Sequence, residues 1–184
     1  MKIMIFDDSA FHQGMAQRQL SEHTLTIFGN YEEALRALSF GKEEFDVVLT
    51  DLMVPAFPHD LGRINEEMPV GTSIALLALA KGVKKVAIVS DANHHDHPGV
   101  RATDELMHFK QIGDMNFRCL QEAVSLYDKE TMEVVKRDFL YTDEGEQKYP
   151  KILSKDKSCV VGWKGLIRGK RWDWAMKDFL PETI

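Results

Sequence analysis

The stretch Phe45-Asp46-Val47-Val48-Leu49-Thr50-Asp51-Leu52-Met53-Val54-Pro55 contains an apolar run that ends at a carboxylate and is soon followed by a proline. A short apolar, β-branched run between polar and proline residues is typical of a strand covered on both faces, as in a parallel α/β sheet. Ligands of such sheets bind just beyond the carboxyl ends of the strands. Asp51 is therefore a candidate for chemistry if other polar residues reach the same edge.

Composition narrows the class of protein. The chain has 184 residues, 44% of them hydrophobic, which predicts one domain with an elaboration. Its net charge of −6 argues against a general nucleic-acid binder, because phosphate binding needs a basic surface. Cys119 and Cys159 form no CxxC motif, which indicates a reducing compartment. No apolar segment has the length of a secretory signal or of a membrane span, so we expect a cytoplasmic protein with no membrane or nucleic-acid partner.

The first half of the chain alternates strand-like and helix-like segments. Strands are expected at Lys2–Phe6, Leu25–Phe28, the run ending at Asp51, and Lys85–Val89. Helices are expected after Ser9 and Asn30, which have N-cap side chains, and over about 72–81. Alternating strands and helices predict a parallel sheet with right-handed crossovers.

The second half is less regular. We expect a proline-rich loop over 56–70, a helix around Arg101–Phe109, a β-hairpin over Ala123–Val135, and an amphipathic closing helix that contains Trp172. The apolar run Cys159–Trp163 is expected to be the fifth strand. An insertion of about 110–157 would then separate the fourth helix from that strand.

Polar residues follow the expected strands in a fixed order. The motifs are Phe6-Asp7-Asp8-Ser9, Thr50-Asp51-Leu52-Met53-Val54-Pro55, Val89-Ser90 and Trp163-Lys164. This ordered set resembles the response-regulator receiver domain of the CheY-like superfamily, the phosphoacceptor half of two-component signalling. The resemblance covers about residues 1–92 well and 158–184 loosely. It implies a single α/β domain over residues 1–184, with a flavodoxin-like, doubly wound, five-stranded parallel sheet in the order 2-1-3-4-5.

The resemblance also implies a site. Asp51 would accept the phosphoryl group, with Lys164 and Ser90 stabilising the transferred charge. Mg²⁺ would be held by Asp8, Asp51 and the backbone carbonyl of Met53, with Asp7 in support. The residue types fit this chemistry, because Mg²⁺ is usually bound by one or two carboxylates and an aspartate can act as a nucleophile. A lysine and a hydroxyl can stabilise developing phosphoryl charge.

Other residues leave alternatives open. Lys110 competes with Lys164 as the site lysine, although its neighbours are less strand-like. Asp91 adds negative charge beside Ser90, and Gly165 stands where a proline usually follows the receiver lysine. The three imidazoles of His94, His95 and His97 could hold Zn²⁺, but adjacent ligands in one loop rarely converge, so a solvated loop is favoured.

We therefore expect a phosphorylation-dependent signalling switch with no conventional turnover beyond autophosphorylation and autodephosphorylation. Its partners would be an upstream histidine kinase or phosphotransfer protein and a downstream protein bound by the insertion. The alternative is a pseudo-receiver that binds a protein partner without phosphorylation. A phosphatase-like hydrolase is disfavoured, because Met53 stands where an aspartic acid would be expected.

Overall fold

The computed structural model describes residues 1–55, 67–92, 98–108, 110–121, 123–135, 151–153, 160–163, 165–177 and 179. The chain separates into two compact units. The larger unit is Met1–Ala123 together with Lys170–Ile184, and the smaller unit is Val124–Gly169. Among the described residues, no helix combines the length and the apolar character that a membrane span requires.

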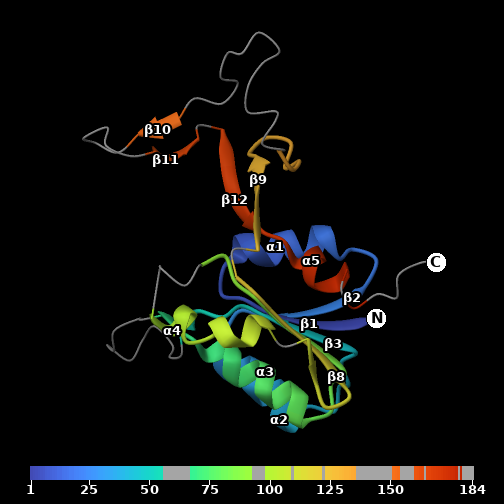
Figure 1. Ribbon diagram of the computed structural model, residues 1–184. Helices are drawn as coiled ribbons and strands as arrows, with labels where there is room; N and C mark the ends of the chain where they lie inside the picture. The colour runs from blue at the N-terminus through green and yellow to red at the C-terminus, as the bar shows by residue number, and fades with distance from the viewer. Residues whose placement is uncertain are drawn as a thin grey trace, which may run out of the picture. The chain divides into compact units, whose positions relative to one another are not determined.

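The larger unit is built on a six-stranded, mostly parallel sheet with the order β2-β1-β3-β6-β8-β7 (Figure 1). The strands are β1 (Lys2–Phe6), β2 (Thr24–Phe28), β3 (Val47–Thr50), β6 (Lys85–Val89), β7 (Gln111–Ile112) and β8 (Met115–Leu120). The pairs β1–β2, β1–β3, β3–β6 and β6–β8 are parallel. The short edge strand β7 pairs antiparallel with β8, so the sheet has one strand more than the five expected.

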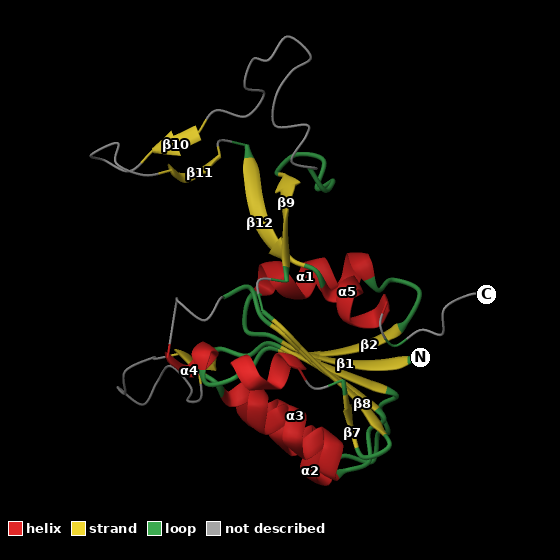
Figure 2. Ribbon diagram, viewed as in Figure 1, coloured by secondary structure: helices red, strands yellow, loops and turns green. Residues whose placement is uncertain are grey.

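The central strands are apolar because helices cover both of their faces. Figure 2 shows α1 (Ala10–Gln19) and α5 (Trp172–Lys177) on one side of the sheet, with α2 (Tyr31–Phe40) and α3 (Val70–Ala80) on the other. All four residues of β3 are buried, as the opening apolar run predicts. Parallel strands buried on both faces read as continuous apolar runs.

Local capping fixes where the first two helices begin. The Ser9 hydroxyl accepts a hydrogen bond from the backbone N–H of His12 at 3.4 Å. The Asn30 side chain accepts from the backbone N–H groups of Glu32 and Glu33. Side-chain acceptors of this kind satisfy N–H groups that have no partner within the first helical turn. Both predicted N-caps are confirmed.

The prediction that Cys159–Trp163 is the fifth strand is wrong. The place beside β6 is taken by β8, whereas β11 (Val160–Trp163) pairs antiparallel with β10 (Lys151–Leu153). The strands β7 and β8 lie inside the range 110–157 that was expected to be inserted. In β8 only Phe117 and Cys119 are buried. This strand near the edge of the sheet therefore lacks the continuous apolar run that made the central strands recognisable.

Other parts of the second half are shorter than expected. The helix predicted around Arg101–Phe109 is instead a four-residue helix, α4 (Pro98–Arg101), and a 3₁₀ helix, Asp104–His108. The predicted hairpin appears as one antiparallel bridge between Tyr127 and Val134.

The smaller unit holds two strand pairs. Strand β9 (Val124–Asp128) pairs with β12 (Leu166–Lys170), and β10 pairs with β11. Most of the proline-rich loop predicted over 56–70 lies outside the described residues. On either side of it in the sequence, β4 (Val54–Pro55) pairs antiparallel with β5 (Glu67–Met68), and both belong to the larger unit.

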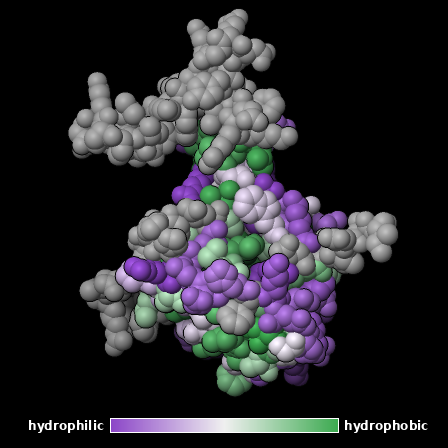
Figure 3. All heavy atoms as spheres, viewed as in Figure 1, coloured by the Kyte–Doolittle hydropathy of each residue, from purple (hydrophilic) through white to green (hydrophobic). Residues whose placement is uncertain are grey.

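The visible surface is mixed in character. In Figure 3, hydrophobic residues appear at several separate places among hydrophilic ones. This view of the described residues therefore shows no single extended apolar patch.

Candidate functional site

Asp51 lies at the carboxyl end of β3, where the opening stretch predicted it. Its backbone N–H donates to the carbonyl of Phe6 at 2.7 Å, which joins it to the end of β1. Its Oδ1 accepts from the backbone N–H of Leu52 at 2.6 Å. The side chain is buried, so one carboxylate oxygen is fixed and the other is turned toward the neighbouring charged residues.

Asp7 and Asp8 follow β1 at the same edge of the sheet. Asp7 is fully buried, and its Oδ1 accepts from the backbone N–H of Ser9 at 2.8 Å. Asp8 is exposed. Carboxylate oxygens of Asp7, Asp8 and Asp51 all lie within 4.8 Å of one another. Three carboxylates at this spacing fit a hard divalent cation that prefers oxygen ligands, such as Mg²⁺.

Met53 lies two residues after Asp51 and is buried. Met53 therefore lies near the carboxyl end of β3. The resemblance to receiver domains implies that its backbone carbonyl would be a ligand of Mg²⁺.

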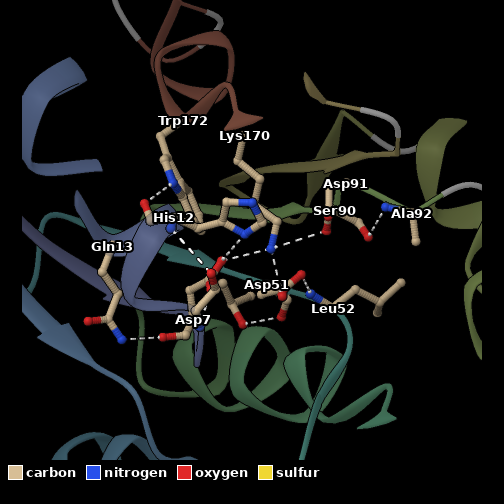
Figure 4. Close-up of polar contacts among 12 residues, drawn as sticks. Asp7, His12, Gln13, Asp51, Leu52, Ser90, Asp91, Ala92, Lys170 and Trp172 are labelled. Atoms are coloured by element: carbon tan, nitrogen blue, oxygen red, sulfur yellow. Dashed lines mark hydrogen bonds and ion pairs between the residues drawn. The ribbon is translucent and has the colours of Figure 1, made fainter. Parts of the chain in front are cut away.

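A lysine reaches this edge from the far end of the chain. Lys170 is the last residue of β12, its side chain is fully buried, and its Nζ lies 2.6 Å from Asp51 Oδ2 (Figure 4). The same Nζ lies 2.7 Å from Asp7 Oδ2 and 3.5 Å from Asp91 Oδ1. The predicted Lys164 lies outside the described residues, and Lys110 is exposed. Lys170 is thus the lysine that the described structure brings to Asp51.

The backbone explains how so distant a residue arrives there. The N–H of Arg171 donates to the carbonyl of Ala123 at 2.8 Å, which joins the two ends of the segment Val124–Gly169. Lys170, which directly precedes Arg171, therefore lies close to the chain that leaves β8. The sequence held one clue: Lys170 directly precedes the amphipathic closing helix, whereas Lys164 does not.

Ser90 lies at the end of β6 and is buried. Its N–H donates to the carbonyl of Leu120 and its own carbonyl accepts from the N–H of Ala123. Its hydroxyl oxygen accepts from the N–H of Ala92 at 3.2 Å. Ser90 is thus fixed between the fourth and fifth parallel strands, with a hydroxyl proton left to donate.

Burial and charge act against each other at these residues. Burial raises the pKa of Asp51 to about 7, although the positive charge of Lys170 opposes the rise. Burial also opposes ionisation of Asp7, but the nearby His12 imidazole and the charge of Lys170 hold its pKa below the usual value. Burial and the negative charge of Asp7 raise the pKa of Asp8.

For Lys170, burial and the neighbouring charges also have opposite effects on the pKa. Burial disfavours its ammonium form, but the charges of Asp51 and Asp7 outweigh burial and raise the pKa of Lys170. Lys170 is therefore a fixed cation among carboxylates, and the excess negative charge favours binding of a further cation.

Two site neighbours were not identified from the sequence. His12 Nδ1 lies 3.6 Å from Asp7 Oδ2, and the His12 carbonyl accepts from Trp172 Nε1 at 3.0 Å. A histidine one turn into a helix and a tryptophan in a closing helix carry no motif, so only the tertiary structure reveals their position. His94, His95 and His97 lie outside the described residues.

No protein family and no curated protein matches the sequence. The fold is similar to the N-terminal domain of a response regulator/sensory box/GGDEF three-domain protein from Carboxydothermus hydrogenoformans, with 18% identity and a TM-score of 0.42 over 67% of this chain and 82% of that one. It is also similar to a fusion protein containing the yeast Spc42 trimeric coiled coil, with 20% identity and a TM-score of 0.43 over 67% and 69% of the two chains. At this level of similarity, a function is supported by the site geometry alone.

Proposed function

We propose that this chain is a receiver-type signalling switch in which Asp51 accepts a phosphoryl group in the presence of Mg²⁺. The observation that supports this is the meeting of Lys170 Nζ with Asp51 Oδ2 at 2.6 Å and Asp7 Oδ2 at 2.7 Å at the carboxyl edge of the sheet. Removing charged groups from water costs several kcal/mol per ion, by order of magnitude. Such a cluster is more readily explained by chemistry than by stability.

Each residue has a role in phosphoryl transfer. An oxygen of the Asp51 carboxylate attacks phosphorus and forms the P–O bond of an aspartyl phosphate. The P–O bond of acetyl phosphate breaks and releases acetate, or the P–N bond of a phosphohistidine breaks and releases the imidazole. The Lys170 ammonium moves from the Asp51 carboxylate to the transferred phosphoryl oxygens, where it offsets their charge. The Ser90 hydroxyl donates to a phosphoryl oxygen.

The carboxylates of Asp7, Asp8 and Asp51, with the Met53 carbonyl, would hold the cation. When bound, Mg²⁺ neutralises charge on the phosphoryl oxygens and favours the ionised form of Asp51. The phosphoryl donor would be a histidine kinase or a phosphotransfer protein, and the output would be binding of a downstream protein.

The second candidate is a pseudo-receiver that binds a protein partner without phosphorylation. Asp91 favours this reading, because its Oδ1 lies 3.5 Å from Lys170 Nζ and places a further negative charge beside the expected phosphoryl position. Like charges at a phosphoryl site weaken binding of the phosphoryl group.

Acetyl phosphate with Mg²⁺ tests the proposal. Intact-mass spectrometry should show one phosphoryl adduct that is absent in Asp51→Asn. The matched control is Asp46→Asn, which changes an exposed aspartate just before the same strand and should be labelled like the wild type. Beryllofluoride should change tryptophan fluorescence in the same Asp51-dependent way. Absence of both Asp51-dependent effects would favour the pseudo-receiver.

A further inference from the structure

The backbone around Lys170 determines where its ammonium group lies. The chain passes from β12 into α5 just after this residue, and Lys170 Nζ lies 2.6 Å from Asp51 Oδ2 and 2.7 Å from Asp7 Oδ2. A displacement of about 1 Å can lower a rate about 100-fold, so whatever holds this backbone matters for transfer.

Gln19, the last residue of α1, bridges that turn. Its side-chain Nε2 donates to the carbonyl of Lys170 at 2.8 Å. Its Oε1 accepts from the backbone N–H of Asp173 at 3.2 Å. One amide therefore holds the chain on both sides of the step from Lys170 into α5. We propose that Gln19 is a positioning residue for Lys170, an inference that rests on the proposed phosphoacceptor function.

The chemistry of the bridge requires a primary amide. The Lys170 carbonyl needs a donor, and the Asp173 N–H, which lies in the first turn of α5, needs an acceptor. Glutamine supplies both from one planar group. Glutamate keeps the acceptor but loses the donor, and methionine keeps the length but loses both.

A second contact from the same helix holds α5. The Trp172 side chain is fully buried, and its Nε1 donates to the His12 carbonyl near the start of α1. Lys170 Nζ lies 5.7 Å from the centroid of the Trp172 ring. Helix α1 thus fixes Trp172 through its first half and Lys170 through its last residue, and Figure 4 shows His12, Trp172 and Lys170 grouped above Asp7.

The test compares Gln19→Met with Gln17→Met, an exposed glutamine on the same helix. Two readouts are used: the rate of Asp51 labelling by acetyl phosphate, and the rate at which acetic anhydride modifies the Lys170 amine, followed by peptide mass spectrometry. The exposed Lys177 is the internal reference for the second readout. The second readout does not require phosphorylation.

In Gln19→Met we expect about tenfold slower Asp51 labelling and about tenfold faster Lys170 acetylation, with Lys177 and Gln17→Met unchanged. The double variant Gln19→Met/Lys170→Met should label no more slowly than Lys170→Met alone, because Gln19 acts through the lysine. If Gln19→Met does not fold by circular dichroism, Gln19→Glu takes its place with the same expected direction.

Different results would contradict the positioning role of Gln19 and the phosphoacceptor function of Asp51. Unchanged Lys170 acetylation in the folded Gln19 variant overturns the positioning role, whether or not the wild type accepts a phosphoryl group. A wild type that is not labelled, with Lys170 exposed in the Gln19 variant, overturns the phosphoacceptor function and supports the role of Gln19 in holding the lysine. An additive loss in the double variant also overturns the positioning role.

Discussion

Arg171 donates its backbone N–H to the carbonyl of Ala123 at 2.8 Å, so the chain leaves the larger unit and returns to it at one place. Between these residues lies the whole of Val124–Gly169, the smaller compact unit. Lys170, which meets Asp51, is the first residue of the returning chain. The lysine thus occupies the position it would have if β8 led directly into α5.

This closure predicts that the smaller unit can be removed. Replacing Val124–Gly169 with a Gly/Ser linker of about four residues should leave a folded protein, because joining ends that are already adjacent needs only a short loop. Circular dichroism and Mg²⁺-dependent labelling of Asp51 would check this. A deletion protein that folds but is no longer labelled would show that the smaller unit is needed for the site itself.

Removing the lysine should destabilise the fold. Lys170→Met leaves Asp7 and Asp51 as buried carboxylates without their cation, and breaking a buried ion network in this way costs about 3–5 kcal/mol. Urea unfolding with Mg²⁺ absent measures this change in the free energy of unfolding.

The matched control for that variant is Lys177→Met. Lys177 is an exposed lysine on α5 whose Nζ lies 3.6 Å from Asp173 Oδ2. An exposed helical ion pair contributes only about 0.3–0.5 kcal/mol, so this variant should unfold almost like the wild type. Equal losses in the two lysine variants would contradict the assignment of Lys170 as the buried cation.

Mg²⁺ should stabilise the wild type in the same assay. The carboxylates of Asp7, Asp8 and Asp51 lie close enough to share one ion, and a ligand that binds only the folded state adds about 2.7 kcal/mol at a hundred times its dissociation constant. Asp8→Asn removes an exposed ligand without opening the core, so it should fold and lose most of this gain. EDTA should return the wild type to its metal-free stability. A gain that Asp8→Asn retains in full would place the ion elsewhere.

The residues also show what the sequence could and could not predict. Val47–Thr50 and Asp51 were predictable, because burial on both faces leaves a continuous apolar run that stops at a carboxylate. Strand β8 was not, because only Phe117 and Cys119 in it are buried and the pattern is weak. The choice of lysine depended on the Arg171–Ala123 hydrogen bond, which no sequence pattern encodes. A lysine next to the closing helix was the one readable clue.

Cys119 provides a direct test of the corrected fifth strand. Its side chain is 3% exposed in β8, and burial raises the pKa of the thiol to about 11. The thiolate is the reactive form, so both effects slow attack on a disulfide reagent. In a Cys159→Ser protein, Cys119 should react with DTNB at pH 8 at least 100-fold more slowly in buffer than in urea, because reaction requires opening of the strand.

A protein without cysteine is the control for the DTNB measurement. Cys119→Ser in the Cys159→Ser background removes the remaining thiol and should give no signal in buffer or urea. Destabilising the fold with Lys170→Met should speed the reaction of Cys119 if modification needs global unfolding. A rate set by local opening of β7 and β8 would not change. Rapid, complete reaction of Cys119 in the folded protein would be incompatible with its burial in β8.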